Sequence, residues 1–333
     1  MHIPDNYLSP ATCALLGAAA APVLAISVKK VKEEVSTESM PMLGIGAAFS
    51  FLMMMFNVPL PGGTTGHAVG GTLIAIMAGP YSACLAVSAA LAIQALLFGD
   101  GGILSLGANI FNMAFVLPFA GYFVFSAIKK ALGSKKGEAI GAVCGAYIGL
   151  AAAALLTAIE FGIQPLIFKD ASGLPLYCPY PLSVSIPAMM APHLLAACVV
   201  ESAFTVFIYS FVKKVSPGSI YAGEKKRSKA IYALLSVLII LVPLGLLAEG
   251  TAWGEWGADE ISVTAYSGSV LGFTPKGMLN GFSFPSPLPD YAPSGMPDAL
   301  GYIISAVFGV AVSIILFRLL GGFLKAKSPG SHA

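Results

Sequence analysis

The sequence predicts an all-α polytopic membrane protein with about nine transmembrane helices. Of its 333 residues, 57% are hydrophobic and only 10% are charged, whereas a soluble domain carries about 25% charged residues. The mean hydropathy is +0.84. The net charge of +2 is spread over short loops, so we expect no nucleic-acid partner.

The apolar segments define the helices, because a helix needs about 20 apolar residues to cross the hydrocarbon core. Seven segments meet this requirement as single helices: 8–28, 40–60, 106–128, 138–161, 183–212, 229–248 and 299–322. An eighth segment, 68–97, is too long for one helix and contains Gly79-Pro80, a pair that interrupts helices. We expect a short helix over 68–78 and a longer returning helix over 80–97.

The distribution of lysine and arginine supports this division, because basic residues collect in cytoplasmic loops. With the N-terminus outside, sixteen of the 18 basic residues fall on the cytoplasmic side, and only Lys169 and Lys276 fall outside. Treating 68–97 as one helix would scramble this asymmetry in every later loop. The sequence therefore predicts a multi-pass protein of the cell membrane with its N-terminus outside and its C-terminus cytoplasmic. No cleavable signal precedes the first span, so we expect that span to direct insertion.

The chain divides into two regions at a basic linker, 213–229. Residues 1–217 hold seven spans, and residues 218–333 hold two spans around a segment rich in Gly, Pro and Ser, 249–298. That composition is rich in turns, so we assign no helix or strand to it. The topology also predicts which segments share the outward side of the membrane: 1–7, 58–67, 99–102, 162–182 and 249–298.

Two histidines on the outward side suggest a metal site. A free terminal amine, the following amide nitrogen and the imidazole of His2 can close around one metal ion as fused small chelate rings. His67 lies in the turn Pro61-Gly-Gly-Thr-Thr-Gly-His67, where glycines let the backbone approach closely. If Met1 and His2 meet His67, the chain offers four nitrogens in a square, which suits Ni²⁺, Co²⁺ or Cu²⁺. The alternative is a frayed terminus and a histidine that is merely a polar turn residue.

Polar side chains near these histidines are candidates for orienting an imidazole by accepting its free N–H. Asn109 and Asn112 lie three residues apart on one face of the helix that follows the loop 99–102. Thr65, with its neighbour Thr64, is a weaker candidate of the same kind. The alternative for the two asparagines is a bond to backbone between packed helices.

His193 and Glu201 are ionisable residues within the span 183–212, and intramembrane ionisable residues are functional candidates by default. No His-Glu-x-x-His motif accompanies them, so we expect a structural pairing of the two inside the bundle. His332, near the C-terminus, carries no prediction. The five cysteines form no Cys-x-x-Cys pair. No Gly-x-x-x-x-Gly-Lys-Ser/Thr motif occurs, so we do not expect this chain to bind ATP in that way.

Three stretches carry a family resemblance: Met1-His2-Ile3-Pro4-Asp5 with Tyr7-Leu8-Ser9-Pro10, the turn Gly63-Thr-Thr-Gly-His67, and Gly99-Asp-Gly-Gly with Leu106-Gly-Ala-Asn109. They look like the substrate-binding membrane (S) subunit of cobalt/nickel energy-coupling-factor transporters, the CbiM/NikM type. The resemblance covers about residues 1–215. It implies a seven-helix bundle that captures Ni²⁺ or Co²⁺ through Met1, His2 and His67.

The resemblance also implies partners: a transmembrane coupling (T) subunit and two cytoplasmic ATPase subunits. The metal ion would be bound as transported substrate, and no cofactor is implied. The C-terminal hairpin looks like the accessory CbiN/NikN-like subunit of such systems, fused to the same chain. That subunit usually carries Pro-Asp-Gly-Leu-Glu, whereas this chain reads Pro297-Asp298-Ala299-Leu300-Gly301. The departure leaves the role of the hairpin open.

The favoured hypothesis is therefore high-affinity capture and uptake of Co²⁺ or Ni²⁺ by a protein that is not an enzyme. An intramembrane metal-dependent enzyme would need an open coordination position and a general base such as Glu201 near the metal. A stand-alone secondary carrier would typically contain an inverted repeat, and we find none between the halves. The ligands do not distinguish cobalt from nickel, because both accept nitrogen donors; cobalamin-synthesis genes beside this one would favour cobalt.

Overall fold

The apolar segments form a helical bundle in the computed structural model, which describes residues 1–36, 39–60, 64–133, 135–215, 229–248, 250–266, 269–293 and 295–325. Among these residues, seven helices are long and apolar enough to cross a membrane. They are α1 (Pro10–Glu34), α4 with η2 (Pro80–Ile93, Gln94–Phe98), α5–η3–α6 (Leu106–Asn109, Ile110–Val116, Leu117–Leu132), α7 (Lys135–Ile167), α8–η4–α9 (Leu182–Pro192, His193–Ala197, Cys198–Val215), α10–η6 (Lys229–Leu241, Val242–Leu247) and α12 (Asp298–Lys325). With the shorter α2 (Met40–Met55) and α3 (Gly71–Ala78) they make up the nine expected helices. The all-α polytopic prediction is confirmed.

The predicted break in 68–97 occurs at Gly79. Its φ of 89° and ψ of 154° separate α3 from α4, and residues other than glycine rarely adopt that conformation. Pro80 then begins α4. Proline is tolerated at this position because the first N–H groups of a helix have no partner within the helix. Only Gly79 therefore separates the end of α3 from the start of the returning helix α4.

The predicted span 40–60 is wrong at its C-terminal end. Helix α2 ends at Met55, and Val58–Leu60 forms strand β1, which pairs antiparallel with strand β2 (Thr64–Gly66). Pro59 cannot donate a hydrogen bond inside a helix, and it lies opposite Thr65 in this hairpin. The hairpin matters for the site, because His67 directly follows β2.

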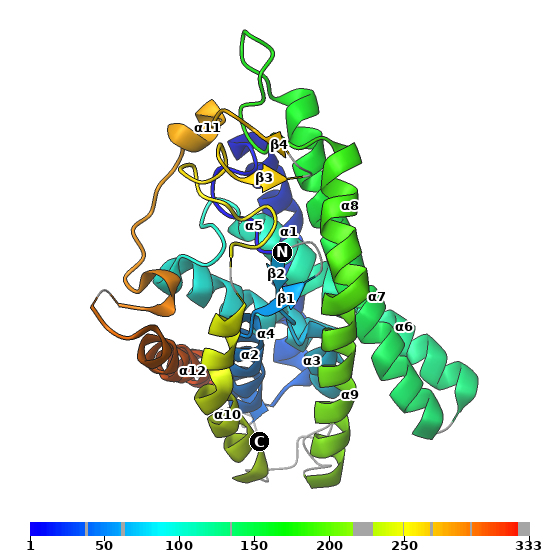
Figure 1. Ribbon diagram of the computed structural model, residues 1–333. Helices are drawn as coiled ribbons and strands as arrows, with labels where there is room; N and C mark the ends of the chain where they lie inside the picture. Colours follow the sequence, from blue (N-terminus) through cyan, green and yellow to red (C-terminus); the bar gives the residue numbers. More distant parts are fainter. Residues whose placement is uncertain are drawn as a thin grey trace.

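The segment 249–298 contains short elements that the sequence did not predict: strands β3 (Ala265–Tyr266) and β4 (Ser269–Val270), helix α11 (Lys276–Leu279) and η7 (Pro289–Tyr291). Backbone N–H groups of this segment, among them those of Leu288, Gly277 and Trp253, tie it to the rest of the chain. Leu288 donates to the Leu97 carbonyl at 2.9 Å, Gly277 to that of Leu176 at 2.8 Å, and Trp253 to Thr64 Oγ1 at 2.7 Å. Figure 1 shows the N-terminus lying between the bundle and the loops that carry β3 and β4.

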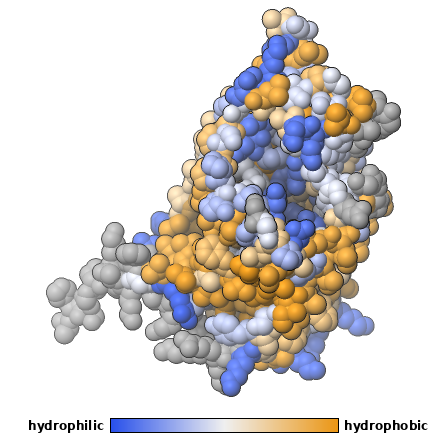
Figure 2. Space-filling model, turned by 60° about the vertical axis from the view of Figure 1, so that its left-hand side comes forward, coloured by the Kyte–Doolittle hydropathy of each residue, from blue (hydrophilic) through white to orange (hydrophobic). Residues whose placement is uncertain are grey.

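The two ends of the bundle differ in the residues that they gather. The N-terminus, the β1–β2 hairpin, the loop after η2, the loop before α8 and the segment 250–293 meet at one end through the hydrogen bonds described here. Lys129 and Lys213 lie in the last turns of α6 and α9, and both pair with Glu138 in the first turn of α7. Figure 2 shows a hydrophobic belt on the face that it presents, with a hollow of hydrophilic residues above it.

Several sequence features fall partly or wholly on residues outside those described, among them residues 61–63 of the turn before His67. The basic linker 213–229 is described only for residues 213–215 and 229, and His332 lies beyond the last described residue.

Candidate metal centre

The first three residues are buried, and hydrogen bonds of Ile3 and Asp5 hold the N-terminus to the loop after η2. Asn109 clamps the backbone of Ile3 from both sides: its Oδ1 accepts from Ile3 N at 2.8 Å, and its Nδ2 donates to Ile3 O at 3.0 Å. Ser105 Oγ and Gly102 N donate to the same carbonyl. The Asp5 carboxylate accepts from the backbone N–H groups that open α5, including Leu104 N at 2.7 Å. The N-terminus is therefore an ordered part of the fold rather than a frayed end.

This clamp brings His2 against His67. His67 Nε2 lies 3.2 Å from His2 Nδ1, and the ring centroids are 4.7 Å apart. The side chains are almost completely buried, with 2% of His2 and 6% of His67 exposed. For metal–nitrogen bonds of about 2.0–2.1 Å, neighbouring nitrogens in a square lie about 2.9 Å apart. The observed separation is within a few tenths of an ångström of that value.

The tautomer of His67 follows from its surroundings. Its Nδ1 lies 3.1 Å from the Ala68 carbonyl, which can only accept a hydrogen bond. Nδ1 therefore holds the proton, and Nε2 presents its lone pair to His2. Burial lowers the pKa of His67 well below 6.5, and the nearby His2 and terminal amine lower it further. A neutral imidazole is the form that binds a metal ion.

Asp100, in the loop after η2, is the acidic neighbour of this pair. Its Oδ1 lies 3.1 Å from His2 Nδ1, and its Oδ2 accepts from Gln94 Nε2 at 3.0 Å and from the Tyr291 hydroxyl. Burial raises the pKa of this carboxyl, but His2 and the hydrogen bonds outweigh that effect and hold the pKa well below its usual range. A proton on His2 Nδ1 thus faces both a carboxylate and an imidazole nitrogen, and a cation at this point would replace it.

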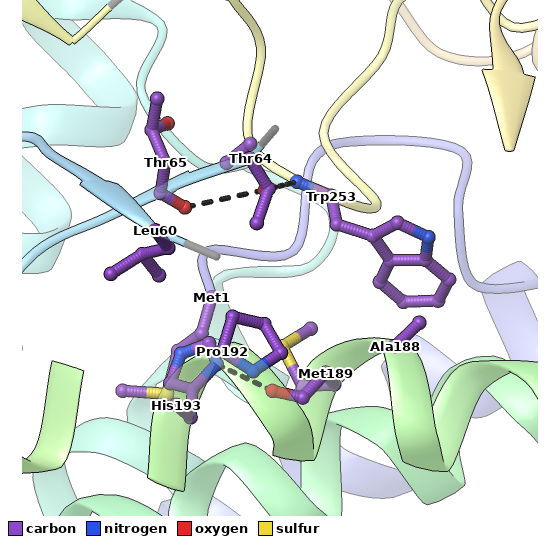
Figure 3. Close-up of a pocket in the computed structure, with 10 residues that line it drawn as sticks. Met1, Leu60, Thr64, Thr65, Ala188, Met189, Pro192, His193 and Trp253 are labelled. Carbon is purple, nitrogen blue, oxygen red and sulfur yellow. Dashed lines mark hydrogen bonds between the residues drawn. The ribbon is translucent and has the colours of Figure 1, made fainter. Parts of the chain in front are cut away.

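The terminal amine of Met1 pairs with a residue from the far end of the chain. The amine lies 3.0 Å from Glu255 Oε1, and the Met1 side chain is buried. Figure 3 shows Met1 between Leu60 of β1 and the α8–η4 residues Met189, Pro192 and His193, with Trp253 across the pocket. The segment that follows η6 thereby reaches the same centre as the N-terminus.

A polar cavity joins the histidine pair to Asp100 and Glu255. It is lined by the two histidines, by Thr65 and by residues of the segment 250–293 and of α12. Three carboxylates, those of Asp100, Glu255 and Asp290, stand in its wall. A concave surface with negative charge raises the local concentration of cations, so the cavity is suited to admit a metal ion to the histidine pair.

The structure brings His2, with the adjacent Met1, against His67, and Thr65 lines the cavity beside the two histidines. Asn109 lies at the site but holds the Ile3 backbone, not an imidazole. Asn112 lies away from the histidines, because its Nδ2 donates to Thr157 Oγ1 at 3.2 Å and to Glu160 Oε2 at 2.8 Å.

The expected pairing of His193 with Glu201 is not formed. His193 Nδ1 lies 2.7 Å from the Met189 carbonyl one turn earlier in its own helix. Glu201 instead accepts from the backbone N–H groups of Val69 and Gly70. The residues are eight positions apart, so each meets a different neighbour along the helix.

The sequence reasoning missed Asp100 and Glu255. Asp100 had a detectable signal, because it is the acidic residue in a glycine-rich loop expected on the same side as the histidines. Glu255 had none, since its contact with Met1 spans 254 positions and no local pattern marks it.

Comparisons with known proteins agree with this architecture. The family model of the cobalt uptake substrate-specific transmembrane region, CbiM, matches residues 2–219, and the PDGLE domain model matches residues 227–326. The chain is 50% identical to a probable fused nickel transport protein, LarMN, of Lactiplantibacillus plantarum, over 96% of this chain and 97% of that one. It is 43% identical to the fused nickel transport protein NikMN of Rhodobacter capsulatus, over 97% of each chain.

A solved structure of a truncated transition metal transporter is also similar. It is 51% identical, covers 64% of this chain and 99% of its own, and superposes with a TM-score of 0.61. Fold and comparisons together define a multi-pass membrane protein of the nickel and cobalt transport class, and not an enzyme. The chain belongs to the CbiM family, with a C-terminal PDGLE domain on the same polypeptide.

Proposed function

We propose that this protein captures Ni²⁺ or Co²⁺ as transported substrate, with the Met1 amine, the backbone and imidazole nitrogens of His2, and His67 Nε2 as ligands. The observation that supports this most directly is the 3.2 Å approach of His2 Nδ1 to His67 Nε2 beside a buried terminal amine. Four nitrogens in a tetragonal arrangement suit these metals better than Mg²⁺ or Ca²⁺. Nickel is favoured, because two relatives matched over nearly their whole length are named nickel transport proteins.

Residues 1–217 would form the metal-binding S-component, and residues 218–333 an accessory region whose loop 249–298 covers the site. We further propose that a membrane coupling subunit and two cytoplasmic ATPase subunits drive uptake across the cell membrane. The N-terminus, and with it the metal centre, would face outward. The carboxylates that line the cavity support this direction of access, because they would attract cations from outside.

The ligand assignment is tested by isothermal titration of Ni²⁺ and Co²⁺ into purified protein. We expect His67→Ala and His2→Ala to abolish tight binding, because each removes one nitrogen of the square, while both variants still insert and stay monodisperse. Asn112→Ala is the control, since its side chain bonds to Thr157 and Glu160 and lies away from the histidines. Unchanged affinity in both ligand variants would exclude the assignment.

The role of the Met1 amine needs a separate variant with one glycine added before Met1. This extension moves the amine out of the chelate without changing a side chain. We expect nickel affinity to fall nearly as far as in His2→Ala. Wild-type affinity in the extended protein would exclude the amine as a ligand and leave the histidines in place.

The transport mechanism is tested in proteoliposomes loaded with ATP on the side of the ATPase subunits. We expect uptake of ⁶³Ni²⁺ only when the coupling subunit, the ATPases and ATP are all present. Uptake by the chain alone, driven by an ion gradient, would instead identify a secondary carrier.

A further inference from the structure

One buried carboxylate outside the histidine pair is connected to it through a single peptide unit. Glu201 of α9 is fully buried, and its Oε2 accepts from Val69 N at 2.8 Å and from Gly70 N at 3.0 Å. The Val69 N–H belongs to the same peptide unit as the Ala68 carbonyl. That carbonyl is the partner of His67 Nδ1 at 3.1 Å.

A peptide unit is planar and rotates as one body. The bond that Glu201 makes to the Val69 N–H therefore also sets the direction of the Ala68 carbonyl, which points the opposite way because the peptide is trans. Hydrogen bonds in such a chain polarise one another, and a bond to an ionised carboxylate is stronger than one between neutral groups.

The next peptide unit is held in the same manner. Gly70 N donates to Glu201, and Ser50 Oγ donates to the Val69 carbonyl at 2.8 Å. Gly70 has a φ of 74°, so the chain turns sharply there into α3. Side chains from α9 and α2 thus fix two successive peptide units directly after His67.

We infer that Glu201 is a positioning residue for metal capture, acting on His67 through the Ala68–Val69 peptide. Its carboxylate fixes the carbonyl that keeps the proton on His67 Nδ1, and the Nε2 lone pair is thereby directed at His2 Nδ1. The inference rests on the proposed function, in which the lone pair of His67 Nε2 binds the metal ion. The arrangement is equivalent to the carboxylate–histidine pairs that orient metal ligands, with a peptide unit inserted between the two side chains.

The first measurement is Glu201→Gln in the full-length protein, with Glu160→Gln as the matched control. Glu160 is also a buried carboxylate in the bundle, but it accepts from Asn112 rather than from the turn after His67. Outer partners of metal ligands typically contribute 10–100-fold to affinity. We expect Glu201→Gln to lower Ni²⁺ affinity by about that factor, because a neutral amide oxygen makes weaker bonds to the two N–H groups than a carboxylate oxygen does. We expect Glu160→Gln to leave the affinity close to wild type.

A readout without metal reports the positioning directly. The chain has only four histidines, so ¹⁵N labelling of histidine gives few ring signals, and those absent in His67→Ala belong to His67. We expect His67 to carry its proton on Nδ1 in the wild type and in Glu160→Gln, and on a mixture of both nitrogens in Glu201→Gln. If Glu201→Gln does not insert, Glu201→Asp is measured instead, since it keeps the charge but shortens the reach to both N–H groups.

A double-mutant cycle separates positioning from general damage. Cu²⁺ is used, because it binds nitrogen sites more tightly than the neighbouring metals and remains measurable after one ligand is lost. We expect Glu201→Gln to add no further loss in the His67→Ala background. An equal loss in both backgrounds, or an unchanged His67 tautomer, would overturn the inference. Wild-type Ni²⁺ affinity in His67→Ala would instead overturn the proposed function, whatever Glu201→Gln does.

Discussion

At the scale of single residues, the metal centre depends on how firmly the N-terminus is held. The first residues of most domains are mobile unless something ties them down. Here Asn109 satisfies both polar groups of the Ile3 backbone, and Asp5 accepts from the loop that leads into α5. The imidazole of His2 is therefore fixed by backbone bonds on the residue that follows it.

Asn109→Ala removes two of the four hydrogen bonds that hold the Ile3 backbone and leaves the Ile3 N–H without its partner. We expect Ni²⁺ affinity to fall by about 10–100-fold, as for other groups that support metal ligands. Asn112→Ala is the matched control, because Asn112 also loses two buried bonds but contacts Thr157 and Glu160. Titration calorimetry measures both variants, and an equal loss in the two would contradict this role of Asn109.

At the scale of elements, close helix packing depends on glycines at the contact between α6 and α7. A Cβ added at Gly145 would lie 2.5 Å from the Gly121 carbonyl oxygen, and one added at Gly121 would lie 2.2 Å from Thr72 Oγ1. Small residues at such contacts let helix backbones approach within a membrane protein. Helix α3, which follows His67, also takes part in this contact through its residue Thr72.

Gly145→Ala would therefore overpack this contact. We expect a loss of about 1–3 kcal/mol in the free energy of unfolding and a lower Tm. Gly17→Ala is the control, because a Cβ there meets nothing within 4 Å and alanine favours the helix. Thermal unfolding in detergent measures both, and an unchanged Tm for Gly145→Ala would show that the helices can separate at little cost.

At the scale of the whole molecule, the C-terminal region completes the surroundings of the N-terminal site. Glu255 pairs with the Met1 amine, the Tyr291 hydroxyl bonds to Asp100, and the Trp256 carbonyl accepts from the Tyr7 hydroxyl. Asp290 and Tyr291 both have positive φ, 53° and 61°, which is uncommon for residues other than glycine. The contacts that hold this strained turn are also contacts of the site.

The chain has only two tryptophans, Trp253 and Trp256, and both belong to the segment 250–293. Trp253 lines the pocket around Met1. We expect Ni²⁺ bound beside Trp253 to change the tryptophan fluorescence with the same midpoint that calorimetry gives for binding. His67→Ala should abolish the response. Nickel binding without any change in fluorescence would mean that the segment lies away from the loaded site.

Local patterns predicted much of the fold, because membrane insertion is decided by features that are contiguous in sequence. The length of each apolar run, the Gly79-Pro80 pair and the one-sided lysines define the nine helices and their order. The ends of the helices were harder to predict. Residues 58–60 form a strand where the end of a helix was expected. Val58 and Leu60 are as apolar as a helix interior, and only pairing with Thr64–Gly66 selects the strand.

The sequence by itself also determined the donor chemistry of the candidate site, since a histidine at position 2 and a histidine in an apposed turn are the nitrogen donors available there. Only the tertiary structure decided how these donors are held and covered. The Glu201 contact spans 132 positions and the Glu255 contact spans 254. A carboxylate acquires such a partner only when helices pack, and neither periodicity nor spacing along the chain records which distant backbone N–H or amine it will meet.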